Sequence, residues 1–173
     1  VDSLCSAVGS LTNPHNLSNA ASSLMGRKTS DHAIKNYLDY LEDSYLFSKA
    51  KRYDVKGKRY FDNTKKFYAV DLGLRNAKLN FRQQEETHLM ENVIYNELCI
   101  RGFNVDVGVV EYNHKDEDGK SKRAKLEVDF VANKGNKRCY IQSAFAISGE
   151  EKRLQEINSL RRIDDSYKKI VVV

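Results

Sequence analysis

The chain has 173 residues, of which 40% are hydrophobic and 31% charged, a composition typical of globular domains. This length suits one medium domain or two small ones. No stretch approaches the roughly 18 consecutive apolar residues of a membrane-spanning helix. We therefore expect no signal peptide, no membrane partner and a cytoplasmic location. Because the chain starts at Val1 rather than at Met, we expect it to be part of a longer protein.

The cysteines and histidines do not predict a metal centre. An odd number of cysteines at unrelated spacings is most simply explained by reduced thiols in an intracellular protein. No histidine stands at a zinc-ligand spacing from a cysteine, so no structural metal is assigned. The cysteines are Cys5, Cys99 and Cys139, and the histidines are His15, His32, His88 and His114.

The net charge of +5 is unevenly distributed along the chain. Residues 1–80 contain 13 Lys and Arg against 8 Asp and Glu, whereas residues 81–173 contain 16 of each kind. Most of the excess lies between Lys49 and Lys66. A basic segment of this kind attracts polyanions, so double-stranded nucleic acid is the expected partner. A solvated lysine-rich hairpin without such a partner explains the charge equally well.

Residues 1–78 predict a module of three helices followed by a hairpin. Residues 1–8 read as the end of a helix. Asn13 and the proline after it are a helix N-cap and first turn, and they predict a helix over residues 14–25 that stops at a glycine. Thr29 or Ser30 caps a third helix, which should reach about Phe47. Strands are expected at residues 50–55, 59–61 and 67–70, with a tight Lys-Gly-Lys turn after the first of them.

Three helices and a basic hairpin are the outline of a winged helix-turn-helix. In that architecture the third helix can enter the major groove while the wing touches phosphate. The third helix, residues 31–47, also carries four acids, so its exposed face is not basic. A spacer or a protein contact is therefore an open alternative. The expected DNA contacts are Lys28, Lys35, Lys51, Arg52, Lys56, Lys58 and Arg59.

Residues 71–78 predict a connector, and residues 79–173 predict a second module of mixed α/β type, in the α+β sense. The order helix, three strands, helix, strand implies a mixed sheet flanked by helices. The apolar last strand suits the interior of that sheet. The expected elements are a helix at 85–101, strands at 104–112, 124–131 and 138–147, a helix opened by a Ser148–Glu151 capping box that runs to about 163, and a strand at 169–173.

Acidic side chains interrupt the apolar pattern of this second module. Glu91 shares a helical face with apolar residues three and seven positions on, and a carboxylate there needs a partner. Glu127 and Asp129 point to one face of their strand, and Gln142 lies on the next strand. If Glu91, Asp129 and Gln142 converge, they form an oxygen-rich pocket suited to Mg²⁺.

These fragments resemble the nuclease-like C-terminal domain of a large family of prokaryotic AAA+ ATPases. The matching residues are Glu91-Asn92 with Glu97-Leu98, Glu127–Val131, Tyr140–Gln142 and the linker-like stretch Tyr68–Asn76. The resemblance covers essentially the whole chain. It implies a PD-(D/E)XK-like domain over residues 79–173, preceded by the winged helix. It also implies an upstream ATPase domain that binds ATP and acts as a partner, and it is compatible with a homo-oligomer.

The resemblance assigns roles residue by residue. Glu91 matches the helix acid and Asp129 the metal-binding aspartate, with Glu127 beside them. Gln142 stands where an active member has a second acid, and Ala144 stands where it has a lysine. Losing such groups typically costs several kcal/mol of transition-state stabilisation, so the resemblance implies a catalytically degenerate nuclease that binds DNA. An active endonuclease with a relocated lysine and a protein-docking domain without DNA binding are the open alternatives.

Overall fold

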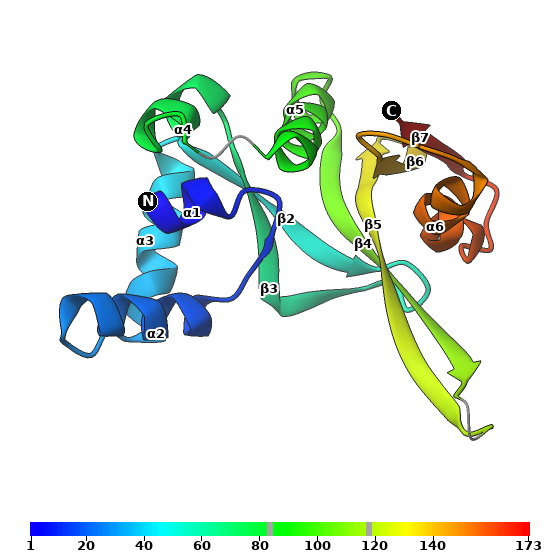
Figure 1. The fold of residues 1–173 in the computed structure, drawn as a ribbon, viewed down its shortest axis with the longest axis horizontal. Coiled ribbons are helices and arrows are strands. Elements are labelled where there is room, and N and C mark those ends of the chain that lie inside the picture. Colours follow the sequence, from blue (N-terminus) through cyan, green and yellow to red (C-terminus); the bar gives the residue numbers. More distant parts are fainter. Residues whose placement is uncertain (83–84, 117–118) are drawn as a thin grey trace. The chain divides into compact units, whose positions relative to one another are not determined.

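The computed structural model describes residues 1–82, 85–116 and 119–173, and Figure 1 shows their helices and strands. They form two compact units of mixed α/β structure. The first contains Val1–Lys51 and Asp62–Asn92, and the second contains Arg52–Phe61 and Val93–Val173. The units are interleaved in the sequence, whereas the predicted boundary lay at a single position near residue 78. No helix of the described residues is both long and apolar enough to cross a bilayer.

Among the described residues, the first unit contains four complete helices and the start of a fifth. Its helices are α1 (Asp2–Ser6), α2 (Pro14–Met25), α3 (Asp31–Asp43), α4 (Leu72–Lys78) and the beginning of α5 (Glu86–Ile100). Its strands are β1 (Leu11–Thr12), the first part of β2 (Phe47–Asp54) and most of β3 (Arg59–Ala69), in the order β1-β3-β2. β1 pairs antiparallel with β3, with Leu11 opposite Lys66.

The capping residues of α2 and α3 behave as the sequence predicts. The side chain of Asn13 accepts a hydrogen bond from the His15 N–H, and Gly26 closes α2 with φ of 61°. That left-handed conformation favours glycine. The side chain of Ser30 accepts from the Ala33 N–H at the start of α3. The two helix starts are therefore confirmed.

Three other predictions for the first unit are wrong. α3 ends at Asp43, because the chain at Phe47 is already in β2. Residues 67–70 do not form a separate strand, since β3 continues from Arg59 to Ala69. The expected connector at 71–78 is the helix α4, which begins because the Asp71 side chain accepts a hydrogen bond from the Leu74 N–H.

Apolar side chains from α1, α3 and the two long strands form the core of the first unit. Its buried members are Leu4, Cys5, Val8, Leu38, Phe47, Phe67 and Ala69. Arg75 of α4 is also buried, and its Nε donates to the Cys5 carbonyl oxygen at 2.8 Å. This bond satisfies a charged group away from water and fixes α4 against α1.

The second unit is a mixed sheet, as predicted, with helix α6 (Glu150–Arg161) and the remainder of α5. Residues Arg52–Asp54 of β2 pair parallel with β4, and β6 pairs parallel with β7. The β4–β5 and β5–β6 ladders are antiparallel. The strands that follow β2 are β4 (Asn104–Lys115), β5 (Ser121–Lys134), β6 (Lys137–Ser143) and β7 (Lys168–Val172).

The core of this unit requires close approach of β4 and β5. A Cβ atom on Gly108 would lie 2.9 Å from side-chain atoms of both Val128 and Val131, so only glycine fits there. The ladder shifts register between Asp106 and Gly108, which marks a bulge at this contact. Tyr140 of β6 and Leu160 of α6 belong to the same buried cluster.

The C-terminal elements depart from the predicted pattern. β6 ends at Ser143, four residues earlier than expected. The predicted capping box does not form, because Gly149 is the N-cap of α6 and no side chain caps that end. β7 pairs with β6 and stands last in the strand order of the described chain, with its apolar residues only half-buried.

The packing of α2 on α3 generates a pH-dependent prediction. The Asp31 carboxylate accepts a hydrogen bond from the Ser18 hydroxyl and lies 3.0 Å from Nδ1 of His15. These two hydrogen bonds, Ser18 first, lower the pKa of Asp31. A lowered folded-state pKa stabilises the fold above the unfolded value of about 3.9 and loses that effect as the pH falls through the folded value.

We expect Asp31→Asn to lower the melting temperature at pH 7. The difference from the wild-type chain should shrink as the pH falls below about 4, because the native carboxylate is then protonated as well. Thermal unfolding followed by circular dichroism across this pH range measures the effect. Asp43→Asn, at the exposed C-terminal end of α3, is the matched control. Equal losses for both variants would contradict the prediction.

Candidate nucleic-acid interface

The predicted helix acid Glu91 lies buried in the first unit. Its side-chain Oε1 accepts hydrogen bonds from Lys66 Nζ at 2.9 Å and from the Tyr68 hydroxyl at 2.7 Å, both from β3. The neighbouring Asn92 exchanges two hydrogen bonds of 2.8 Å with the backbone of Ala69. A cation and a hydroxyl therefore satisfy this carboxylate, and the contacts join α5 to β3.

The predicted strand acid Asp129 lies in the second unit, where its Oδ2 accepts from the Ser143 N–H at 2.7 Å. Phe130 stands opposite Ile141 in the ladder, so Gln142 is the cross-strand neighbour of Asp129. The structure thus brings these two predicted site residues together. The amide oxygen of Gln142 accepts from the Ser159 hydroxyl of α6 at 3.4 Å.

Both acids of the predicted metal site already have hydrogen-bond partners. Glu91 is engaged by Lys66 and Tyr68, and Asp129 by a backbone N–H. Within residues 1–82, 85–116 and 119–173, no group of three or more His, Cys, Asp or Glu side chains is arranged to hold a metal ion. A Mg²⁺ site at these residues therefore remains a prediction.

Lys125 is the basic residue nearest in sequence to the acidic pair Glu127 and Asp129. Its ammonium lies 3.1 Å from the Glu111 carboxylate and 4.9 Å from the centre of the Phe61 ring. Lys125 stands four positions before Asp129, which is about 13 Å along β5. Lys125 therefore contacts groups at some distance from the predicted catalytic position.

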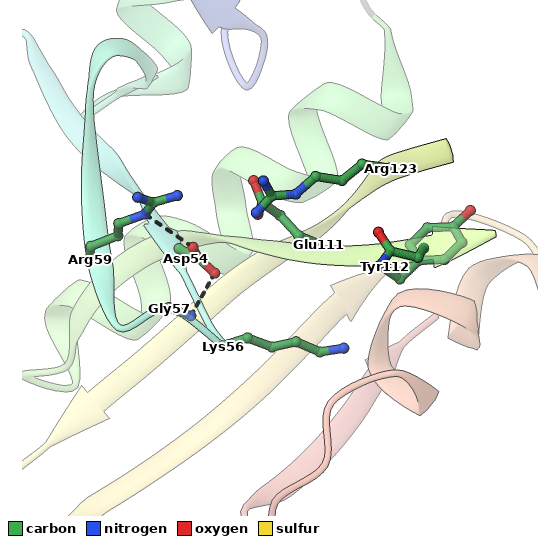
Figure 2. A pocket seen from close by; sticks show the side chains of 8 residues that line it. Asp54, Lys56, Gly57, Arg59, Glu111, Tyr112 and Arg123 are labelled. Atoms are coloured by element: carbon green, nitrogen blue, oxygen red, sulfur yellow. Dashed lines mark hydrogen bonds and ion pairs between the residues drawn. The ribbon is translucent and has the colours of Figure 1, made fainter. Parts of the chain in front are cut away.

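A buried acid, Asp54, lies at the turn between β2 and β3. Asp54 is 3% exposed, and its carboxylate accepts from the Gly57 N–H at 2.9 Å and from Arg59 Nε at 3.3 Å. Figure 2 shows both interactions. A Cβ atom on Gly57 would lie 2.3 Å from this carboxylate, so the turn requires glycine. The carboxylate closes the predicted tight turn and anchors Arg59.

On the β4–β5 hairpin, a largely covered acid likewise pairs with exposed cations. The Glu111 side chain is 10% exposed and pairs with the guanidinium of Arg123 and the ammonium of Lys125. These two cations are 64% and 51% exposed. The acid is thus largely withdrawn from water while its cationic partners remain accessible.

Cations from both hairpins surround the ring of Phe61. The guanidinium carbons of Arg52 and Arg59 lie 5.5 and 5.8 Å from the ring centre, and Lys125 lies on the same ring. Cations at such distances are attracted to an aromatic face. We call the resulting cluster the basic surface, and its members are Arg52, Lys56, Lys58, Arg59, Arg123 and Lys125.

A hollow of about 690 Å³ lies within this surface, and we call it the two-arginine pocket (Figure 2). It is lined by Asp54, Lys56, Gly57, Arg59, Glu111, Tyr112, Asn113 and Arg123. Sequence reasoning did not place Arg123 and Lys125 on this surface. The only signal was the run of basic residues at 120–125, whose charge is balanced by acids elsewhere in the module.

The remaining predicted DNA contacts belong to the first unit. Lys28 and Lys51 are exposed. Lys35 lines a separate hollow of about 520 Å³, together with Lys49 and Lys65. The structure therefore gathers four of the seven predicted contacts, Arg52, Lys56, Lys58 and Arg59, on the basic surface.

Comparison with known proteins places the chain near proteins without an assigned function. Residues 1–85 match the family model described as "Domain of unknown function (DUF8612)". An "Uncharacterized protein" of Haemophilus influenzae is 38% identical over 169 residues, which cover 98% of this chain and 38% of that protein. "Uncharacterized protein MJ1544" of Methanocaldococcus jannaschii is 29% identical over 154 residues, covering 84% of this chain and 33% of that protein. The chain thus spans less than two fifths of each relative, and no solved structure matches it.

The contacts of Glu91 predict a structural role for its partner Lys66. The Lys66 side chain is 5% exposed, and replacing it by methionine leaves a buried carboxylate without its opposite charge. We expect Lys66→Met to lower the free energy of unfolding by about 3 kcal/mol. Urea denaturation measures this loss, with the half-buried neighbour Lys65 changed to methionine as the control. A loss no greater than that of Lys65→Met would refute the structural role.

Proposed function

We propose that this chain binds double-stranded nucleic acid by its phosphate backbone, as an accessory region of a larger ATPase. One observation carries the proposal. Cations from two hairpins gather around Phe61 and the two-arginine pocket, while the acids that accompany them are withdrawn from the surface. The side chains of Asp54 and Glu111 are only 4% and 10% exposed, so a polyanion approaching this surface meets mainly cations.

Exposed Lys and Arg side chains bind phosphates by releasing condensed counterions, which makes the affinity depend on salt. Arginine adds a planar fork of donors that matches phosphate oxygens. Contacts of this type position a protein on a duplex without reading its sequence. The third helix, with its acidic residues, adds nothing that favours base readout, so we propose binding without sequence preference.

The order of elements supports the wider part of the proposal. Helices α2 and α3 followed by the β2–β3 hairpin are compatible with a winged helix whose wing carries four of the six residues of the basic surface. The mixed sheet from β4 to β7 is compatible with a PD-(D/E)XK-like fold. We propose that it is catalytically degenerate, because Gln142 and Ala144 stand where an acid and a lysine would be. The greater length of the relatives leaves room for an upstream ATPase domain.

Fluorescence anisotropy with a labelled duplex across a potassium chloride series tests the binding proposal. With about four phosphate contacts, the slope of log K against log salt should be about −3.6. Arg59→Gln should make this slope shallower by about 0.9 and weaken binding. The control is Arg101→Gln, an exposed cation of the segment after α5, which should change neither quantity. Affinity that ignores salt, or equal effects of the two variants, would overturn the proposal.

The degenerate site generates a separate prediction about cleavage. Supercoiled plasmid incubated with the wild-type chain and Mg²⁺ or Mn²⁺ should show no nicking above the level of a buffer control, because two groups needed for metal-assisted hydrolysis are absent. Gel electrophoresis measures this. Asp129→Ala serves as the matched variant. Nicking by the wild-type chain that disappears in Asp129→Ala would demonstrate an active nuclease.

A further inference from the structure

The two-arginine pocket has a feature that backbone binding alone does not require. Two largely covered carboxylates contact its arginines, although acids weaken the attraction of a surface for polyanions. Asp54 contacts Arg59, and Glu111 contacts Arg123. Simple charge attraction would be stronger if both acids were neutral. Their presence at this place therefore calls for another physical role.

We propose that Asp54 and Glu111 are positioning residues, which hold Arg59 and Arg123 so that the pocket seats one phosphodiester group of a duplex. This inference rests on the proposed nucleic-acid binding and names the site at which it is strongest. Figure 2 shows the two arginines entering the pocket from different hairpins, with Lys56 extending along it. The hairpins fix the two backbones, and the carboxylates fix the side chains.

The hydrogen-bond inventory of the arginines supports this role. Arg59 gives its Nε–H to Asp54, and Arg123 gives an N–H of one terminal nitrogen to Glu111. A guanidinium carries five N–H donors in a rigid fork, so each arginine keeps donors for a phosphate oxygen. A side chain that is already held loses less conformational freedom on binding, which favours affinity. The carboxylates thus weaken the charge attraction but preorganise the two arginine side chains.

The charge of the pocket fits a phosphodiester. Its lining contains three cations, Lys56, Arg59 and Arg123, and two carboxylates, Asp54 and Glu111. The formal sum is therefore one positive charge, which matches the single negative charge of an internal phosphodiester. The terminal phosphate of a DNA end carries close to two negative charges at pH 7. The pocket is better matched to the interior of a duplex than to its end.

Replacing Glu111 by glutamine gives a test in which the two physical effects have opposite signs. If charge alone mattered, Glu111→Gln would bind duplex more tightly, because the surface gains one positive charge. If Glu111 positions Arg123, the variant should bind about fivefold more weakly despite that gain. Glu97→Gln makes the same change of charge on α5, away from the pocket lining, and should leave the affinity within about twofold of wild type.

The measurement is anisotropy at fixed salt with the wild-type chain, Glu111→Gln, Glu97→Gln and Arg123→Lys. The last variant keeps the charge of residue 123 but removes the fork, so it should also bind about fivefold more weakly. It tests the inference on its own should Glu111→Gln fail to fold, as judged by circular dichroism. Equal or tighter binding by Glu111→Gln, or wild-type binding by Arg123→Lys, would overturn the positioning role.

Two duplex probes distinguish binding to an internal phosphodiester from binding to a terminal phosphate. One probe has both ends closed by hairpin loops, and a second probe of equal length has open ends with 5′-phosphates. Equal affinity for both supports an internal phosphodiester, and a preference for the open probe overturns it. Failure of the wild-type chain to bind either duplex would instead refute the proposed function. Wild-type binding with an unaffected Glu111→Gln would refute the pocket inference alone.

Discussion

A carboxylate that is removed from water must be given partners, and this constraint organises both units of the chain. Four acids meet it in different ways. Glu91 takes a lysine and a tyrosine, Asp129 takes a backbone N–H, Asp54 takes a turn N–H and an arginine, and Glu111 takes two exposed cations. In each case the bond fixes a particular element or side chain, so the buried acids act as attachment points of the structure.

The sequence predicts which acids are buried better than it predicts their partners. Glu91 and Asp129 stand out because they interrupt apolar patterns of helix and strand, and both are at least nine-tenths buried. The partner of Glu91, Lys66, belongs to a run of basic residues that reads as a solvated hairpin. Nothing in that run distinguishes the one lysine that turns inward. Lys66 is buried because β3 contacts α5, and this is a tertiary contact of the first unit.

The same difference between local and tertiary interactions explains which bounds of helices and strands were predicted correctly. The starts of α2 and α3 follow from side chains that cap the adjacent N–H groups, and those interactions are local. The lengths of β3 and β6 depend on the strands beside them, so the sequence misplaced their ends. Residues 71–78 were expected to be a connector, whereas the Asp71 cap begins the helix α4. The winged-helix and nuclease-like assignments concern fold families and remain predictions.

The basic surface shows why counting charge along the sequence does not locate a cluster of exposed cations. Residues 81–173 contain equal numbers of basic and acidic residues, so that half of the chain looks neutral. In three dimensions Glu111 is almost fully covered while Arg123 and Lys125 are exposed. A polyanion responds to the charge it can approach, and the covered carboxylate is closer to the arginine than any ligand would be. Such an acid lowers the net charge of the surface by one unit, and it also strongly restricts its own cation. In the proposed phosphate pocket the restriction outweighs the lost charge, because an unrestrained arginine would lose its conformational freedom on binding.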